Sequence, residues 1–190
     1  IGDDYADLIE RARFAGVAVE TALPQAALES TSRIAVATND RKGLFADMAA
    51  TLSLAGADIV GARLATREDG TALEIFEIQD GVGAAYGLNE PRRLALLGRA
   101  LERAVLKGAR TSAQQAHRVT ARRAIFDVHP VVRIDTKIVP HAVVVEVSGA
   151  DRPGLLSELA RAFSAHDLSV RSAHIASFGE RAVDAFYLTD

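Results

Sequence analysis

The chain contains no cysteine and no tryptophan, and only one methionine. Without cysteine it can form no disulfide bond, thiolate nucleophile or cysteine-ligated zinc site, and this lack is typical of a cytoplasmic protein, which is the location we expect. No apolar run approaches the roughly 18 residues that span a membrane, and no signal peptide opens the sequence. We therefore expect no membrane partner. The first residue is Ile1, so we expect a piece of a longer protein.

Aromatic residues are also scarce, at 5% of the 190 residues, and positive charge is not in excess, since the net charge is −3. RNA-binding sheets stack bases on aromatic side chains, and the segment "TALEIFEIQD" (71–80) carries acidic residues where such a sheet needs basic ones. We therefore expect no nucleic-acid partner. The one feature that favours this alternative is a basic stretch, which we interpret as a solvated helix face or a docking surface for other domains: Arg99, Arg103, Lys107, Arg110, Arg118, Arg122 and Arg123.

Catalytic patterns are missing as well. The sequence shows no metal-spaced group of His, Asp and Glu, no Ser-His-Asp set and no phosphate loop. We expect this chain to have no catalytic residue, no metal site and no cofactor, and to have no enzymatic activity by itself.

One short segment is present twice. Residues 40–52 read "DRKGLFADMAATL" and residues 151–163 read "DRPGLLSELARAF". Each follows a β-branched run and precedes two extended segments that are joined by a short turn. The apolar residues after each glycine fall at i, i+1, i+4, i+5 and i+8, which predicts an amphipathic helix. Each copy therefore predicts the order strand, helix, strand, hairpin, strand.

The first copy continues with a helix that starts near Pro91 and ends at Gly108, a basic insert at 108–124, and an extended segment at 130–135. This order predicts an α+β fold of two ferredoxin-like βαββαβ modules. The second module is truncated after its third strand, at Asp190. We predict an N-terminal segment with a helix and a strand that could extend the first sheet (1–31), a first module (32–136) and an incomplete second module (137–190).

The repeated turn has a plausible chemistry. The first N–H groups of a helix lack internal partners and attract an anion, and Gly43 or Gly154 lets a ligand approach the backbone. Asp40 and Asp151, three residues earlier, could receive an ammonium group. Together these groups fit the zwitterionic head of a free amino acid. The alternative is that each aspartate only caps its helix, and the sequence leaves both interpretations open.

The second copy resembles the ACT domain family in "DRPGLL" and in "SVRSAHIASFGERAVDAFYLTD". The two copies together are similar to the tandem ACT domains in the C-terminal regulatory region of the bifunctional protein-PII uridylyltransferase/uridylyl-removing enzymes. That resemblance implies glutamine sensing in nitrogen metabolism, with the catalytic domains of a longer chain and PII as partners and a homodimer as a possibility. It implies Mg-dependent nucleotidyltransferase and HD-type hydrolase activities in the parent enzyme, outside this chain. The alternative is a ligand-free pair that serves structure or protein–protein interaction.

In ACT domains that bind amino acids, contacts come from the loop between the first strand and the helix and from the start of the second strand, often across two modules. Lys42 replaces the proline of the family pattern, and Ser169 and Asp58 stand where some members have asparagine. For His174 and Arg63, further along the second strand, a packing role is favoured over ligand contact. The resemblance implies these ligand-binding residues: Asp151, Arg152, Gly154, Leu155 and Ser169, with Asn39, Asp40, Arg41, Gly43, Leu44 and Asp58.

Overall fold

The structure is a computed structural model that describes residues 3–26, 29–107, 128–137, 142–152, 154–178 and 181–189. The whole predicted basic insert (108–124), with Arg110, Arg118, Arg122 and Arg123, lies outside these residues. The elements in chain order are η1 (Asp3–Tyr5), α1 (Ala6–Ala15), β1 (Val17–Ala22), β2 (Ser32–Asn39), α2 (Leu44–Leu54), β3 (Asp58–Thr66), β4 (Thr71–Gln79), α3 (Pro91–Lys107), β5 (Val131–Asp135), β6 (Val143–Ala150), α4 (Leu155–Ala165), β7 (Ser169–Phe178) and β8 (Arg181–Thr189).

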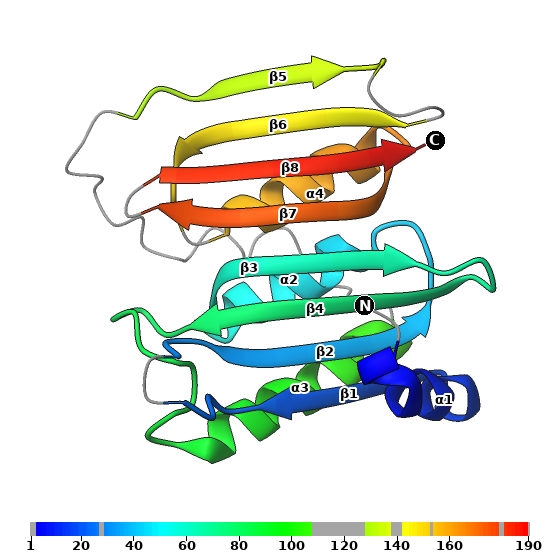
Figure 1. Ribbon diagram of the computed structural model, residues 1–190, viewed down its shortest axis with the longest axis vertical. Coiled ribbons are helices and arrows are strands. Elements are labelled where there is room, and N and C mark those ends of the chain that lie inside the picture. Colours follow the sequence, from blue (N-terminus) through cyan, green and yellow to red (C-terminus); the bar gives the residue numbers. More distant parts are fainter. Residues whose placement is uncertain are drawn as a thin grey trace.

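In the described part of the chain the strands form one eight-stranded sheet in the order β1-β2-β4-β3-β7-β8-β6-β5 (Figure 1). Every neighbouring pair is antiparallel. The sheet contains two similar units. In the first unit β2, α2, β3 and β4 give the strand order β2-β4-β3, and in the second unit β6, α4, β7 and β8 give the order β6-β8-β7. The predicted α+β fold with ferredoxin-like modules is confirmed.

The place of β5 differs from the prediction. The segment at 130–135 was expected to close the first module, but β5 pairs with β6 of the second unit, with Arg133 opposite Glu146. The edge of β2 is instead taken by β1, which pairs with it along its whole length. Because β1 reaches this edge through a short connection, no edge of β2 remains for β5. The expectation that the N-terminal strand extends the first sheet is confirmed.

The absence of cysteine makes this pairing easy to test. Partners in an antiparallel ladder have Cα atoms about 4.5–5.5 Å apart, within the range of a disulfide bond. We expect the double variant Arg133→Cys/Glu146→Cys to form an intramolecular disulfide on mild oxidation, measured by thiol titration and mass spectrometry. The control Arg133→Cys/Glu20→Cys places one thiol on β1, at the opposite edge of the sheet. Efficient closure of the control pair would show that β5 extends the first unit after all.

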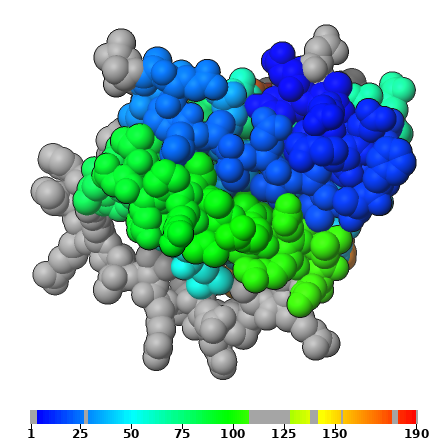
Figure 2. Space-filling view, turned by 90° about the horizontal axis from the view of Figure 1, so that it is seen from below, coloured from blue at the N-terminus to red at the C-terminus, as the bar shows by residue number. Residues whose placement is uncertain are grey.

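The helices cover the two faces of the sheet unequally. The larger core cluster joins α2 and α3 to residues such as Ile34, Val36 and Phe76, while a smaller cluster joins α1 to Ala35 and Ala37 on the other face. Figure 2 shows α1 and α3 at the β1 end of the molecule. β2 is covered on both faces, which explains why its sequence is almost continuously apolar rather than alternating.

The second unit is less covered at its edge. Val132 and Ile134 of β5 are 59% and 68% exposed, and they share a face with Val145 and Val147, which belong to the core. At the other edge, α3 packs against β1, and a Cβ placed on Gly98 would lie only 3.2 Å from Thr21 Cγ2. Within the described residues, β5 has no helix in the position that α3 occupies in the first unit.

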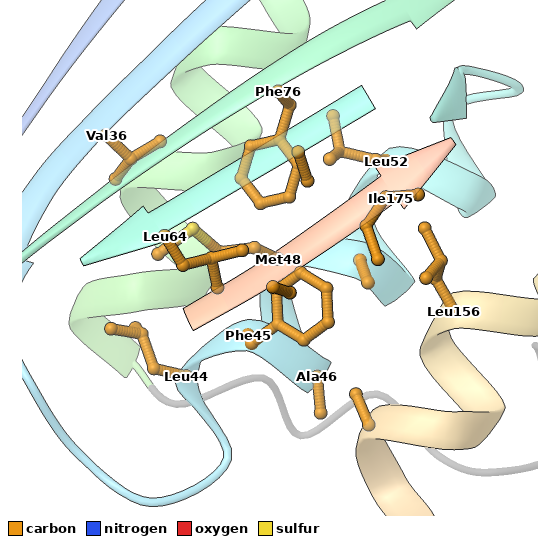
Figure 3. Packing of buried hydrophobic residues seen from close by; sticks show 14 of the residues in the cluster. Val36, Leu44, Phe45, Ala46, Met48, Leu52, Leu64, Phe76, Leu156 and Ile175 are labelled. Carbon is orange, nitrogen blue, oxygen red and sulfur yellow. The ribbon is translucent and has the colours of Figure 1, made fainter. Parts of the chain in front are cut away.

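The two units share one core. Phe45 of α2 stacks on Phe76 of β4, with ring centroids 6.1 Å apart, and lies 6.5 Å from Phe186 of β8. Figure 3 shows Phe45 and Leu52 of α2 beside Leu156 of α4 and Ile175 of β7. The contact between the units is therefore part of the folded interior.

Candidate functional site

The boundary between the units has an approximate two-fold symmetry. β3 and β7 pair antiparallel, with Ala62 opposite Ile175, and α2 and α4 lie side by side (Figure 1). The start of each helix faces the end of the other: a Cβ placed on Gly43 would lie 3.7 Å from Ser164 Oγ, and one on Gly154 would lie 3.6 Å from Ser53 Oγ. This arrangement creates two equivalent seams, one at each helix start.

We call the first of these the Asp184 seam. It brings together the loop before α4, the start of β3 and Asp184 of β8. Five predicted site residues line it: Asp151, Arg152, Gly154 and Leu155 from the second unit, and Asp58 from the first.

The other is the Glu74 seam, where the loop before α2 meets the start of β7 and Glu74 of β4. It is lined by the predicted residues Asp40, Arg41, Gly43, Leu44 and, from the second unit, Ser169. The structure thus groups the predicted residues across the units: each loop faces the strand start of the other unit. Asn39 lines neither seam, nor do Arg63 and His174, which contact Glu77 and Tyr187.

The two glycines stand at the helix starts as predicted, and the structure corrects the alternative role of the two aspartates as caps. The N-cap positions are Gly43 and Gly154, whose φ angles of 78° and 84° are left-handed. The interpretation of Asp40 and Asp151 as N-caps is therefore wrong. Asp40 accepts a hydrogen bond of 2.7 Å from Thr66 Oγ1 instead.

Both loop arginines are engaged on their own helices. Arg152 donates two hydrogen bonds to the carboxylate of Glu158, at 2.9 and 2.5 Å, and this contact raises the pKa of its guanidinium. Arg41 donates one hydrogen bond to the carboxylate of Asp47, at 2.6 Å. A ligand carboxylate in either seam would have to share the arginine with this partner.

The space inside the seams is small. Each encloses a cavity of about 20 Å³, which is about the room that one water molecule needs. When the adjoining space that is open to solvent is included, the free volume is about 390 Å³ at the Asp184 seam and about 300 Å³ at the Glu74 seam. A free amino acid can bind only if the loop or the helix ends move apart.

Ion pairs across the units distinguish the two seams. At the Glu74 seam, Lys42 pairs with Asp167, and Arg171 Nη1 lies 3.7 Å from Asp40 Oδ2. In the repeat, the positions that correspond to Asp167 and Arg171 are Gly56 and Val60, which carry no charge. Exposed ion pairs contribute about 0–1 kcal/mol each. The Asp184 seam therefore has no counterpart of these two cross-unit pairs.

Sequence reasoning missed two buried acids. Glu74 is 4% exposed and Asp184 is 1% exposed, and both lie on the helix-covered face of the sheet. Among the described residues, three buried side-chain atoms lack a hydrogen-bond partner: Glu74 Oε2, Asp184 Oδ1 and Ser157 Oγ. A signal was present, because "TALEIF" (71–76) and "RAVDAF" (181–186) each place an acid at an inward position of an alternating strand.

The environment of the two carboxyl groups raises the pKa of both. Burial raises the pKa of Glu74 to about 8, with a further rise from the Asp40 carboxylate and an opposing effect of Arg41. Burial raises the pKa of Asp184 to about 7, opposed by a hydrogen bond from the backbone of Ala176 and increased by Asp151. Near neutral pH both groups are therefore at least partly protonated.

The described residues contain no group of three or more His, Asp or Glu side chains placed to hold a metal ion. The sequence contains one adjacent His-Asp pair, His166-Asp167, in the turn after α4. Asp167 of this pair forms an ion pair with Lys42. None of the described helices is long and apolar enough to cross a membrane.

Comparison with known proteins agrees with this architecture. Residues 143–190 match the family model described as "ACT domain". The second unit is an ACT domain. The loop and helix start of the Asp184 seam thus belong to an ACT domain, and the first unit repeats its strand–helix–strand–strand order.

The chain is also similar to part of a larger enzyme. It is 41% identical over 184 residues to the bifunctional uridylyltransferase/uridylyl-removing enzyme of Caulobacter vibrioides, and 39% identical over 188 residues to that of Phenylobacterium zucineum. Each match covers 97% of this chain and 20% of the relative. The chain thus spans about a fifth of the length of these relatives, is homologous to a C-terminal part of them, and the predicted resemblance is confirmed.

Among solved structures, the chain is similar to aspartate kinase from Synechocystis, with a TM-score of 0.46 and 19% sequence identity. The match covers 88% of this chain and 26% of the kinase.

Proposed function

We propose that this chain is the amino-acid-sensing part of a bifunctional uridylyltransferase/uridylyl-removing enzyme, and that glutamine binding between its two units controls the uridylylation and deuridylylation of PII. One observation carries the proposal: each helix-start loop faces the second strand of the other unit, as a shared amino-acid site requires. The homology to a C-terminal part of these enzymes supports it. The chain itself would be catalytically inactive, and any Mg requirement would belong to catalytic domains outside it.

The seam offers complementary groups for a zwitterion. The N–H groups in the first turn of α4 and the positive end of the helix favour a carboxylate, and acidic side chains line the same cavity. An amino acid exceeds the 20 Å³ cavity, so the bound arrangement must differ from the one described. A ligand regulates only through such a difference, by binding one arrangement more tightly than the other. A hundredfold preference corresponds to about 2.7 kcal/mol.

The direct test is isothermal titration of the 190-residue chain with glutamine, with glutamate as the matched control. We expect saturable binding of glutamine and at least tenfold weaker binding of glutamate. At a free glutamine concentration 100 times the Kd, the chain should also gain about 2.7 kcal/mol in free energy of unfolding. The absence of both a binding heat and a stabilisation would contradict the proposal.

A second candidate is a ligand-free pair that serves as a structural or protein–protein interaction module, including contact with catalytic domains or a second copy of the chain. The small cavities and the cross-unit ion pairs at the Glu74 seam favour it. This candidate predicts that amino acids do not bind to the chain. It also predicts that the isolated chain binds the separately expressed catalytic domains equally well with and without amino acids, which a pull-down experiment measures.

A further inference from the structure

The unpartnered buried atoms are not scattered through the core. All three that occur among the described residues line the two seams, and two of them, Asp184 Oδ1 and Ser157 Oγ, line the same cavity. A buried polar atom without a hydrogen bond is destabilising. Two such atoms around one small cavity indicate a site whose hydrogen bonds are completed by something that enters it.

Ser157 connects this cavity to the start of α4. It lies in the first turn of α4, so its hydroxyl stands beside the free N–H groups of the helix start. A carboxylate bound at those N–H groups would place the α-ammonium of the same ligand in the cavity that Ser157 and Asp184 both line. An ammonium group has three donors and no acceptor, which suits Asp184 Oδ1 and Ser157 Oγ, two oxygen atoms that have no hydrogen-bond partner.

We propose that Asp184, together with Ser157, receives the α-ammonium group of the amino-acid ligand, and that Asp184 releases its proton to the solvent when the ligand binds. This inference rests on the proposed function and assigns the ammonium to Asp184 rather than to Asp151. The ligand class is an α-amino acid with a free, cationic amino group. No bond other than the O–H bond of the Asp184 carboxyl breaks.

The charges around Asp184 favour the binding of a cation. The charged residues that line the cavity are Asp58 from β3 and Asp151 and Arg152 from the loop before α4, while α2 contributes Ala49 and Ser53. Arg152 is turned toward Glu158. The Asp151 carboxylate disfavours a negative charge on Asp184, and a bound ammonium group would oppose this effect by supplying a positive charge.

The direction of the pH effect follows from this arrangement. Burial raises the pKa of Asp184 to about 7 in the empty seam, so below pH 7 the ligand must displace a proton and binds less tightly. The ionised fraction of such a group rises from roughly a tenth at pH 6 to roughly nine tenths at pH 8. The affinity should therefore increase about tenfold over this interval.

The Glu74 seam is the less suitable of the two. Ala46 takes the place of Ser157 and Leu168 that of Ala57, and ion pairs cross its mouth. The seam thus has one unpartnered oxygen rather than two. We assign the ammonium site to the Asp184 seam alone.

The test is titration of the 190-residue chain with glutamine at pH 6, 7 and 8, each in two buffers of different ionisation enthalpy. We expect the affinity to rise about tenfold from pH 6 to pH 8, with net proton release near pH 7. N-acetylglutamine, which lacks the cation, should bind at least tenfold more weakly. Asp184→Asn should lose at least tenfold in affinity at pH 8 together with the pH dependence, and the matched variant Glu74→Gln should keep both.

The outcomes separate this inference from the proposed function. Glutamine binding with no pH dependence and no proton release would overturn the role of Asp184 and leave the sensor intact. The same holds if Asp184→Asn binds like the parent chain, because the cavity would then hold only a water molecule. Absence of glutamine binding to the parent chain at every pH would overturn both. The proton count is measured on the parent chain, so the test does not depend on the folding of a variant.

Discussion

We expect the free energy of unfolding of the variant Glu74→Gln to rise relative to that of the parent chain by about 3 kcal/mol as the pH increases from 5 to 8. Glu74 is buried, and its pKa in the folded chain is raised from 4.5 to about 8, chiefly by burial. The folded state therefore holds its proton more tightly than the unfolded state does. The stability of the parent chain falls as the pH rises from about 4.5 to about 8, because folding at higher pH must either bury a charge or take up a proton.

Glutamine has nearly the same shape and no charge, so the variant does not undergo this loss. Its buried amide has a cost of its own, but that cost is independent of pH. The measurement is urea denaturation of both chains at pH 5, 6, 7 and 8, compared as the difference in free energy of unfolding. The control is Glu77→Gln on the same strand, where the side chain is exposed and paired with Arg63. An equal pH response in both variants would show that burial at Glu74 is not the cause.

The secondary structure was largely readable from the sequence because its signals are local. The apolar residues after Gly43 and Gly154 lie on one helical face, and both glycines do stand at the helix starts. The segment after Gly16 was readable for the same reason, since Gly16 ends α1 in a left-handed conformation. These features depend on the residues themselves and their neighbours, so the repeat of 40–52 at 151–163 repeats the structure.

The pairing of β5 could not be read in this way. The ferredoxin-like order suggested that a strand after α3 returns to the first unit, and nothing within 130–135 contradicts it. The edge of β2 is occupied by β1, which pairs with it over its whole length, so β5 does not pair there. Which strand takes an edge depends on competition between distant segments, and a local pattern does not contain that information.

The site shows the same division. The loop residues were found because the turn is repeated, and the resemblance to ACT domains pointed to Asp58 and Ser169. Glu74 and Asp184 were passed over because each looks like an ordinary polar residue in an alternating strand. The alternation places both acids at inward positions, but only the structure shows that they are buried and that one oxygen of each has no hydrogen-bond partner.

The second large effect concerns the glycines at the helix starts. We expect Gly154→Val to weaken glutamine binding at least tenfold, while Gly43→Val changes it less than twofold. Both glycines have a left-handed φ, 84° and 78°, which a β-branched residue adopts only with strain. Each substitution should therefore lower the free energy of unfolding by about 2 kcal/mol. A side chain at either position also points toward the serine of the facing helix, Ser53 or Ser164.

The two variants are a matched pair because strain and serine contact are the same, and they differ only in which seam is filled. Urea denaturation measures the strain, and isothermal titration with glutamine measures the binding. A loss of about 2 kcal/mol leaves most domains folded, since total stabilities are about 5–15 kcal/mol. Loss of binding in Gly43→Val with retention in Gly154→Val would place the ligand in the Glu74 seam instead. Equal loss in both variants would mean that binding needs both seams, and that the units respond to a ligand as one body.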